Sequence, residues 1–227
     1  MKTWYFLGAC TAVLAYSIVP TYTAKFLHRV RREHGGKTLY LTFDDGPDLL
    51  YTPQLLRLLA RYDIKASFFV VAQFAAQNPA IIQRMQDEGH LVGVHGLVHK
   101  NGMLQMPWQA YSDFQKARQI MQHLGVNIQY FRPPWGHWNV VSACQMYRCG
   151  MKPMLWDVMA QDWSASETAE SIEKKLLQRT TGGSIICLHD GRGKDDAPAR
   201  TIAALRKTIP QWLEQGYRFD TVDHYGK

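Results

Sequence analysis

Cysteine is scarce in this chain. Only Cys10, Cys144, Cys149 and Cys187 occur among 227 residues, and no two of them form a CxxC pair. No disulfide framework can be read from that spacing. Cys187 lies in the apolar run 184–188, so we expect it to be a small core residue. The cysteines therefore do not indicate whether the protein works inside or outside the cytoplasm.

Internal repeats, low-complexity linkers and nucleic-acid-binding motifs are also missing. The composition, with 46% hydrophobic and 20% charged residues, is typical of a globular chain rather than a disordered one. A length of 227 residues fits one large domain or two small ones. The net charge is +7, but without a motif we expect no nucleic acid as a partner.

Charge is absent from residues 3–24, and the core of that segment, 4–19, is strongly apolar. A helix crosses a bilayer with about 17–25 residues, so residues 1–24 are predicted to be a single-pass membrane anchor. Met1-Lys2 resembles a minimal start of a secretory signal, which leaves cleavage and secretion as the alternative.

Basic residues follow this segment at once. They include Lys25, Arg29, Arg31, Arg32 and Lys37, so we expect residues 25–37 to be a juxtamembrane linker that is solvated or contacts anionic head groups. We expect the catalytic domain to be extracytoplasmic. The positive-inside rule would instead keep it in the cytoplasm, so the orientation stays open.

Beyond residue 37, strand-like and helix-like segments alternate to the end of the chain. Strand-like runs occupy 39–43, 66–71, 91–94, 128–131, 154–158, 184–188 and 217–222. Helix-like segments start at residue 52 and then occupy 78–89, 107–124, 139–148, 166–180 and 198–215. Such alternation predicts a parallel sheet in one α/β domain, 38–227, either a barrel or a doubly wound sheet.

Polar side chains stand where these strands end. Asp44-Asp45 follows the first run and His95 with His99 the third; Arg132, Asp157 with Asp162, and His189 follow the fourth, fifth and sixth. The carboxyl ends of parallel strands lie at one edge of a sheet, where barrel active sites gather. We therefore expect these residues to meet in space.

One oxygen and two nitrogens are available for a metal ion. In a helical turn His95 and His99 would share a face, and Asp45 would supply the third ligand. Three protein ligands with an open position are typical of catalytic zinc, although non-haem iron accepts a similar set. The spare carboxylate of Asp44 favours hydrolysis, with Asp44 as the general base.

A hydrolase that expels an amine also needs a proton donor. His189 is the candidate, with Asp157 or Asp162 keeping it protonated, while Arg132 would hold Asp44 ionised and oriented. A backbone N–H in the turn 134–136 could share the charge of the oxyanion.

Several tryptophans lie within or beside these segments. We expect Trp135 and Trp163 to contact the substrate, because aromatic rings suit the apolar faces of sugars or the walls of an acyl pocket.

These motifs resemble a known family. Thr42-Phe43-Asp44-Asp45-Gly46-Pro47, His95-Gly96-Leu97-Val98-His99, Arg132-Pro133-Pro134-Trp135-Gly136, Asp162-Trp163 and Leu188-His189-Asp190 follow the order of the five motifs of polysaccharide deacetylases, the NodB-homology enzymes of carbohydrate esterase family four. The resemblance spans about residues 37–223. It implies a distorted (β/α)7 barrel that removes N-acetyl groups from amino sugars with a divalent metal, usually Zn²⁺, with Co²⁺, Ni²⁺ or Mn²⁺ as alternatives.

The resemblance also assigns roles. It makes Asp44 the base, Asp45, His95 and His99 the metal ligands, and Arg132 the residue that steadies the base. Trp135 falls where a backbone N–H completes the oxyanion site, and His189 is the acid.

Two positions depart from the family pattern. Met159 stands where the family usually has an aspartate; Asp157, two residues earlier, would point to the same side of an extended strand and could replace it. Leu188 is expected to contact the substrate, and Cys187, in place of the common leucine, would enlarge the acyl pocket slightly.

The substrate remains open at this stage. It is expected to be an N-acetylated glycan such as peptidoglycan or a chitin-like oligomer, or a lipid-linked amino sugar. Two other readings are a metalloamidase acting on small amides or imides, and a glycan-binding barrel without catalysis.

Overall fold

A single parallel sheet organises the protein. The computed structural model describes residues 11–32 and 35–226. Its strands are β1 (Thr38–Asp44), β2 (Ser67–Val70), β3 (Leu91–Val94), β4 (Tyr130–Phe131), β5 (Lys152–Pro153), β6 (Val158–Met159), β7 (Ile185–His189) and β8 (Arg218–Phe219). They run in the order β5-β4-β3-β2-β1-β7-β6, with β8 also paired to β1.

The strands β1 and β7 form the centre of the sheet. Both are buried almost throughout, as expected for parallel strands that are covered on both faces. Their register sets Asp44 directly opposite His189, while on the other side Asp44 lies opposite Phe69 of β2. The pairing thus brings the predicted base and the predicted acid to the same sheet edge.

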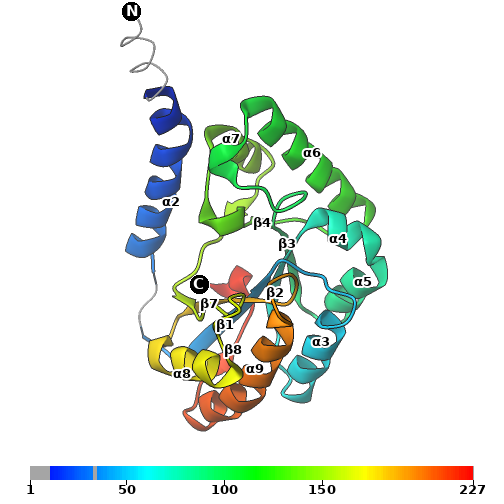
Figure 1. Ribbon diagram of the computed structural model, residues 1–227, viewed down its shortest axis with the longest axis vertical. Coiled ribbons are helices and arrows are strands. Elements are labelled where there is room, and N and C mark those ends of the chain that lie inside the picture. Colours follow the sequence, from blue (N-terminus) through cyan, green and yellow to red (C-terminus); the bar gives the residue numbers. More distant parts are fainter. Residues whose placement is uncertain (1–10, 33–34, 227) are drawn as a thin grey trace, which may run out of the picture.

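Helices cover the outside of the sheet (Figure 1). They are α3 (Thr52–Arg61), α4 (Ala72–Gln77), α5 (Pro79–Asp87), α6 (Pro107–His123), α7 (Val140–Arg148), α8 (Ala169–Arg179) and α9 (Ala197–Glu214). Short 3₁₀ turns lie at η2 (Gly102–Leu104), η3 (Pro134–Gly136) and η4 (Val222–His224).

Local sequence explains where several helices begin and end. Proline stands in the first turn of α3, α5 and α6, where its missing N–H costs no hydrogen bond. The side chains of Asn139 and Thr168 accept from the third residue of α7 and α8. Gly89 and Gly125 have positive φ and follow the ends of α5 and α6.

The predicted α/β class with a parallel sheet is confirmed, and in place of a closed (β/α)7 barrel the sheet is a curled half-barrel with two ends. The strands do not match the predicted ones everywhere. Of the expected strand 154–158 only Val158 lies in a strand, because β5 ends at Pro153 and β6 begins at Val158. Pro153 has no N–H to extend the ladder. The carbonyls of Met154 and Leu155 accept instead from the Arg132 side chain, at 3.3 and 3.0 Å. The sheet ends at β5 on one side and at β6 on the other.

A long helical segment precedes the sheet. Residues 11–13 are helical, a π-helical stretch η1 spans Leu14–Ile18, and α2 spans Val19–Val30. Pro20 accounts for the wider turn, because its ring displaces the carbonyl of Tyr16 and removes one N–H. Within residues 11–32 and 35–226, no helix is long and apolar enough to cross a membrane.

The predicted anchor 1–24 is therefore described only in part, since residues 1–10 lie outside the described residues. The helix α2 also continues past residue 24 to Val30, so most of the predicted linker that is described is helical. The segment is joined to the domain by hydrogen bonds of Ser17, Thr21 and His28.

Candidate active site

Two adjacent carboxylates open the site at the end of β1. Asp44 is 2% exposed and Asp45 is 8% exposed. Neighbouring side chains on a strand point to opposite faces. Asp45, however, has φ of 72°, which breaks the alternation. Both carboxylates consequently approach the same ring: His95 Nε2 lies 3.8 Å from Asp44 Oδ2 and 3.5 Å from Asp45 Oδ1.

His95 directly follows β3, and its ring is held in a defined orientation. Its Nδ1 lies 2.7 Å from the carbonyl oxygen of Arg132 and donates to it. That hydrogen bond assigns the proton to Nδ1 and leaves the lone pair on Nε2, as in metal-binding histidines. Burial lowers the pKa of His95, which favours the neutral ring.

His99 reaches the same place by a different route from the one predicted. Residues 95–99 form a loop and not a helical turn, with positive φ at Gly96 (86°) and His99 (54°). The loop brings the rings of His95 and His99 to a centroid distance of 5.1 Å. His99 Nε2 lies 2.9 Å from Asp45 Oδ1.

The ligating atoms of Asp45, His95 and His99 lie within 4.8 Å of one another, so they fit a divalent cation. Burial raises the pKa of Asp45, but the adjacent imidazoles of His99 and His95 outweigh it and lower the pKa to about 2. The carboxylate is therefore ionised. Asp45 Oδ1 is buried and has no partner of hydrogen-bond geometry, although it faces two imidazole nitrogens. One carboxylate oxygen and two imidazole nitrogens are a donor set that zinc accepts.

Arg132 fixes the other carboxylate. Its guanidinium is completely buried and donates through Nη1 to Asp44 Oδ1 at 2.6 Å and to Thr42 Oγ1 at 2.8 Å. The guanidinium carbon lies 4.0 Å from the ring centroid of Phe69, which restricts its movement. The Arg132 guanidinium thus holds Oδ1 of Asp44, while Oδ2 faces the site.

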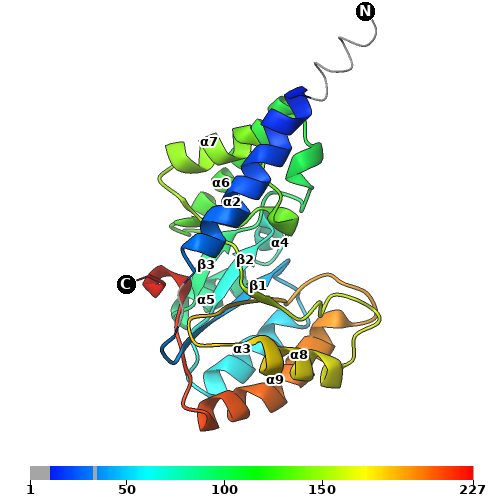
Figure 2. The same ribbon diagram turned by 90° about the vertical axis from the view of Figure 1, so that its left-hand side faces the viewer.

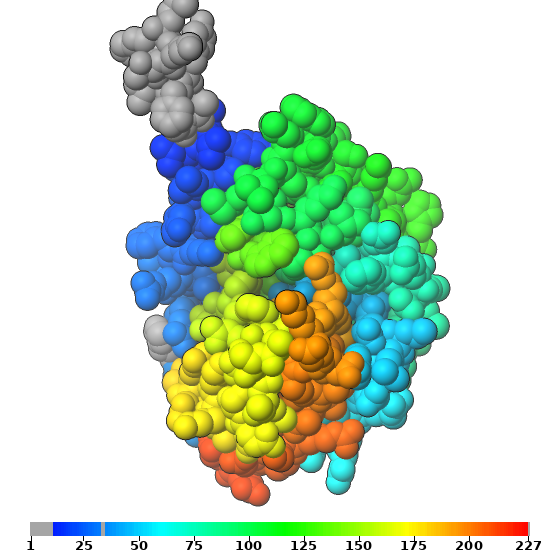
Figure 3. Space-filling model, viewed as in Figure 1, coloured from blue at the N-terminus to red at the C-terminus, as the bar shows by residue number. Residues whose placement is uncertain are grey.

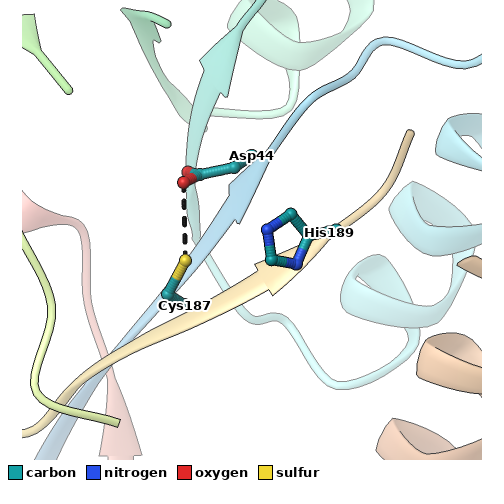
Figure 4. Close-up of side chains that lie close together, drawn as sticks. All are labelled: Asp44, Cys187 and His189. Atoms are coloured by element: carbon teal, nitrogen blue, oxygen red, sulfur yellow. Dashed lines mark hydrogen bonds between the residues drawn. The ribbon is translucent and has the colours of Figure 1, made fainter. Parts of the chain in front are cut away.

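That second oxygen has a partner that the sequence did not indicate. Cys187 Sγ lies 3.4 Å from Asp44 Oδ2 and donates to it, as the dashed line in Figure 4 shows. Burial raises the pKa of the Cys187 thiol well above its ordinary value, so it remains a thiol. The predicted core residue is indeed buried, but it also touches the predicted base.

His189 is bound by Asp162. The Nδ1 atom of His189 lies 2.9 Å from Asp162 Oδ1, and the His189 N–H donates to Asp162 Oδ2 at 2.8 Å. Thr201 Oγ1 donates to the same Oδ2 at 2.8 Å. Burial lowers the pKa of His189, but the charge and hydrogen bond of Asp162 outweigh it and raise the pKa to about 9.

Asp157 does not join this group. Its Oδ2 accepts from the Ile185 N–H at 2.9 Å, and its Oδ1 lies 3.1 Å from His28 Nε2 and 3.3 Å from Arg32 Nε. Ile185 begins β7 and His189 ends it, so the two lie about 13 Å apart along the strand. Asp157 therefore does not replace the aspartate expected at Met159, and Asp162 is the carboxylate that contacts His189.

The predicted substrate contacts divide into two kinds. Trp135 and Trp163 are 49% and 47% exposed, and the Trp135 ring lies 4.2 Å from the His99 ring. Leu188, in contrast, is fully buried in the main core. Side chains alternate along β7, so Cys187 and His189 face the site while Leu188 faces away. The expectation that Leu188 contacts the substrate is not supported by this placement.

Comparison with known proteins agrees with this geometry. Residues 31–154, more than half of the chain, match the family model described as polysaccharide deacetylase. The chain belongs to the polysaccharide deacetylase family. The resemblance inferred from the five motifs is thereby confirmed.

Relatives within the family cover most of the chain. A peptidoglycan-N-acetylglucosamine deacetylase of Bacillus cereus is 34% identical over 188 residues, which is 82% of this chain and 86% of the relative. A chitooligosaccharide deacetylase of Azorhizobium caulinodans is 30% identical over 190 residues, 79% of this chain and 90% of the relative. The solved structure of a peptidoglycan deacetylase from Bacillus subtilis superposes with a TM-score of 0.75 at 29% identity, covering 83% of this chain and 89% of that one.

Proposed function

We propose that this polysaccharide deacetylase hydrolyses the acetamido group of N-acetylglucosamine residues in a glycan, with peptidoglycan or chito-oligosaccharides as the substrate class. One observation carries the proposal. The two adjacent carboxylates have different partners. Asp45 faces two imidazoles, while Asp44 is bound by Arg132 and is not among the three proposed metal ligands. Its relatives in Bacillus cereus and Azorhizobium caulinodans are named for N-acetylglucosamine in peptidoglycan and for chitooligosaccharides.

Asp45, His95 and His99 would hold a divalent cation. When bound, the cation supplies a Lewis acid for the amide carbonyl and makes water a stronger acid. Zn²⁺ suits the donor set best, since catalytic zinc sites in proteins typically have histidine and carboxylate ligands and one open coordination position.

Asp44 acts as the general base in this proposal. Arg132 fixes Oδ1, so Oδ2 is the oxygen that takes a proton from the attacking water. The water oxygen forms a bond to the amide carbon, and the carbonyl oxygen gains the negative charge. The backbone N–H of Trp135 is proposed to donate to that oxygen.

His189 completes the reaction as the general acid. Asp162 keeps the ring protonated around neutral pH, because the pKa of His189 is about 9. The ring gives its Nε2 proton to the amide nitrogen while the C–N bond breaks, which leaves acetate and a free amino sugar. Trp135 and Trp163, both half exposed, are proposed to contact the sugar faces.

Acetate release tests the proposal. The full chain, loaded with Zn²⁺, is incubated separately with chito-oligomers, peptidoglycan fragments and a small cyclic imide. We expect acetate and a mass loss of one acetyl group per reaction from an N-acetylglucosamine substrate. Turnover of the imide alone would favour a metalloamidase, and binding of glycans without turnover would favour a non-catalytic barrel.

A further inference from the structure

The N-terminal helix packs on the domain with its polar face. Ser17 Oγ donates to the carbonyl of Met103 at 3.1 Å. Thr21 Oγ1 donates to the carbonyl of Trp138 at 3.1 Å and accepts from the Trp138 N–H at 2.8 Å. Two turns further along, His28 Nε2 lies 3.1 Å from Asp157 Oδ1. The polar side chains that dock are thus a serine, a threonine and a histidine, and the small side chain of Ala24 packs against the core beside them.

The apolar side chains of the same helix point the other way. Val19, Tyr22, Phe26 and Val30 are 56%, 65%, 64% and 65% exposed. Their spacing of three, four and four residues places them in one stripe. At 100° per residue that stripe is centred about 180° from Ser17, Thr21 and His28. We call Val19, Tyr22, Phe26 and Val30 the outer stripe.

This arrangement reverses the usual one, in which a surface helix buries its apolar side against the protein. Figure 2 shows α2 along the surface that faces the viewer, with the domain behind it. Figure 3 shows the same segment, in blue, at the margin of the molecule. The hydrogen bonds of Ser17 and Thr21 hold the helix in the rotation that exposes the outer stripe.

Positive charge accompanies the stripe. Residues 11–32 contain Lys25, Arg29, Arg31 and Arg32 and no acidic residue. Arg32 lies 3.3 Å from Asp157 Oδ1 and is neutralised there. Lys25 and Arg29 lie on one flank of the stripe, and Arg31 follows the end of α2.

We propose that α2 lies flat in the head-group region of an anionic lipid bilayer, with the outer stripe inserted and its basic flank, Lys25 and Arg29, against lipid phosphates. An apolar stripe with basic flanks on a helix is the pattern of interfacial helices, which bury their apolar face about 5–10 Å deep. The docked polar face then fixes the catalytic domain against the membrane. This contact differs from the predicted transmembrane span, because it uses the surface of a helix that lies on the domain.

A second copy of the chain is the other partner that an apolar stripe could accept, and charge argues against it. Two such helices would bring Lys25 and Arg29 of both copies together without an acidic partner on either helix. Four side chains also offer much less than the roughly 800 Å² per partner of a standard interface. Anionic lipid supplies both the apolar phase and the opposite charge.

Photo-cross-linking in the full chain tests the orientation directly. A benzophenone amino acid replaces Phe26 in one variant and Leu213 in another. Leu213 is an exposed apolar residue of α9, 38% exposed, and serves as the matched control. After irradiation with vesicles of phosphatidylcholine and phosphatidylglycerol, we expect a phospholipid adduct at position 26 and none at position 213. Adducts between two chains at position 26, or equal lipid adducts at both positions, would overturn the proposal.

Flotation with the same vesicles measures the energetics. Phe26→Glu should lower the partition coefficient by about tenfold or more, since an inserted phenylalanine contributes about 1.5–3 kcal/mol. Leu213→Glu should leave it unchanged. Lys25→Glu/Arg29→Glu should weaken binding to anionic vesicles and not to vesicles of phosphatidylcholine alone. Equal flotation of the Phe26 and Leu213 variants, together with no lipid adduct at position 26, would exclude an interfacial α2.

Acetate release from a soluble chito-oligomer separates this inference from the proposed function. The Phe26→Glu enzyme should keep the wild-type rate on that substrate, because the described hydrogen bonds of α2 join it to Trp138 and Asp157 and to none of the residues proposed for catalysis. A loss of lipid contact with full turnover therefore reports on the membrane surface alone.

Discussion

The carboxylate of Asp162 contacts both the imidazole ring and the backbone N–H of His189. One carboxylate oxygen lies 2.9 Å from His189 Nδ1, and the other accepts the His189 N–H at 2.8 Å. These two contacts fix both the tautomer of the His189 ring and the position of the end of β7. Nε2 of the ring is left towards the site, where the leaving amine needs a proton in the proposed reaction.

Asp162→Asn is expected to move the alkaline limb of the kcat profile to lower pH. His189 acts in its protonated form, so activity falls as the pH rises through its pKa, about 9 in the wild type. Without the Asp162 charge, burial is the larger influence and lowers that pKa. Profiles of kcat between pH 6 and pH 10 measure the shift. Asp157→Asn is the matched control and should leave the limb in place; a limb that stays in place in the Asp162 variant would remove Asp162 from this role.

Asp44→Asn should retain the cation and lose turnover. The amide has nearly the same shape but cannot accept a proton from water, and general base catalysis contributes about 10²–10⁴-fold. Metal content by elemental analysis and kcat on a chito-oligomer are the two measurements. Turnover within tenfold of wild type would show that another group is the base, whereas loss of the metal would place Asp44 among the ligands.

Cys187→Ala should lower kcat by about two- to tenfold without changing the metal content. The substitution removes the thiol that donates to Asp44 Oδ2 at 3.4 Å, a weak hydrogen bond of order 1 kcal/mol. Cys187→Ser keeps a donor at the position and should recover part of the rate. If the alanine and serine variants have the same kcat, the contact does not orient the base.

Asp190 links the site to the pH dependence of stability. Burial raises the pKa of its carboxyl to about 7, although Thr52 Oγ1 donates to it at 2.5 Å. The folded state therefore keeps this proton over a pH range in which the unfolded chain, with an ordinary pKa near 3.8, has lost it. The contribution to stability is present below about pH 4 and is lost as the pH rises towards 7.

Asp190→Asn should flatten that part of the profile. Urea unfolding of the metal-free protein at pH 4, 5.5 and 7 gives the free energy of unfolding for both proteins. The difference between wild type and variant should change by up to about 1.4 kcal/mol per pH unit in favour of the variant as the pH rises. A difference that is constant across this range would mean that Asp190 titrates normally in the folded state.

Much of the site could be predicted because parallel strands end at one edge. Asp44, His95, Arg132 and His189 each follow a separate strand, and the structure brings them into contact or into register. The order of the five motifs alone was enough to indicate the family. The expected contact between Arg132 and Asp44 needed no knowledge of distances, since both residues stand at the same edge of the sheet, at the ends of β4 and β1.

The remaining features depend on register and on tertiary contacts. Asp157 and Asp162 were equivalent in the sequence, and only the pairing of Val158 with Ile186 shows that Asp157 lies at the far end of β7. The same pairing logic decides that Cys187 and not Leu188 faces Asp44. Residues 154–157 lie outside any strand because the carbonyls of Met154 and Leu155 accept from Arg132, which is about twenty positions away in the sequence.

The N-terminal segment shows another limit of sequence patterns. An uncharged run of that length predicted a span, but hydropathy carries no information about docking. Ser17 and Thr21 look incidental in an apolar sequence, yet they make the hydrogen bonds that seat the helix on the domain.

The central claim is that Asp45, His95 and His99 hold a catalytic cation beside an unligated base. Acetate release from a chito-oligomer, followed before chelation, after chelation and after addition of Zn²⁺, tests it most directly. We predict loss of turnover on chelation, recovery with about one Zn²⁺ per chain, and neither recovery nor stoichiometric binding in His95→Ala. Full activity of the chelated, metal-free wild type, or an unchanged metal content in His95→Ala, would contradict the account.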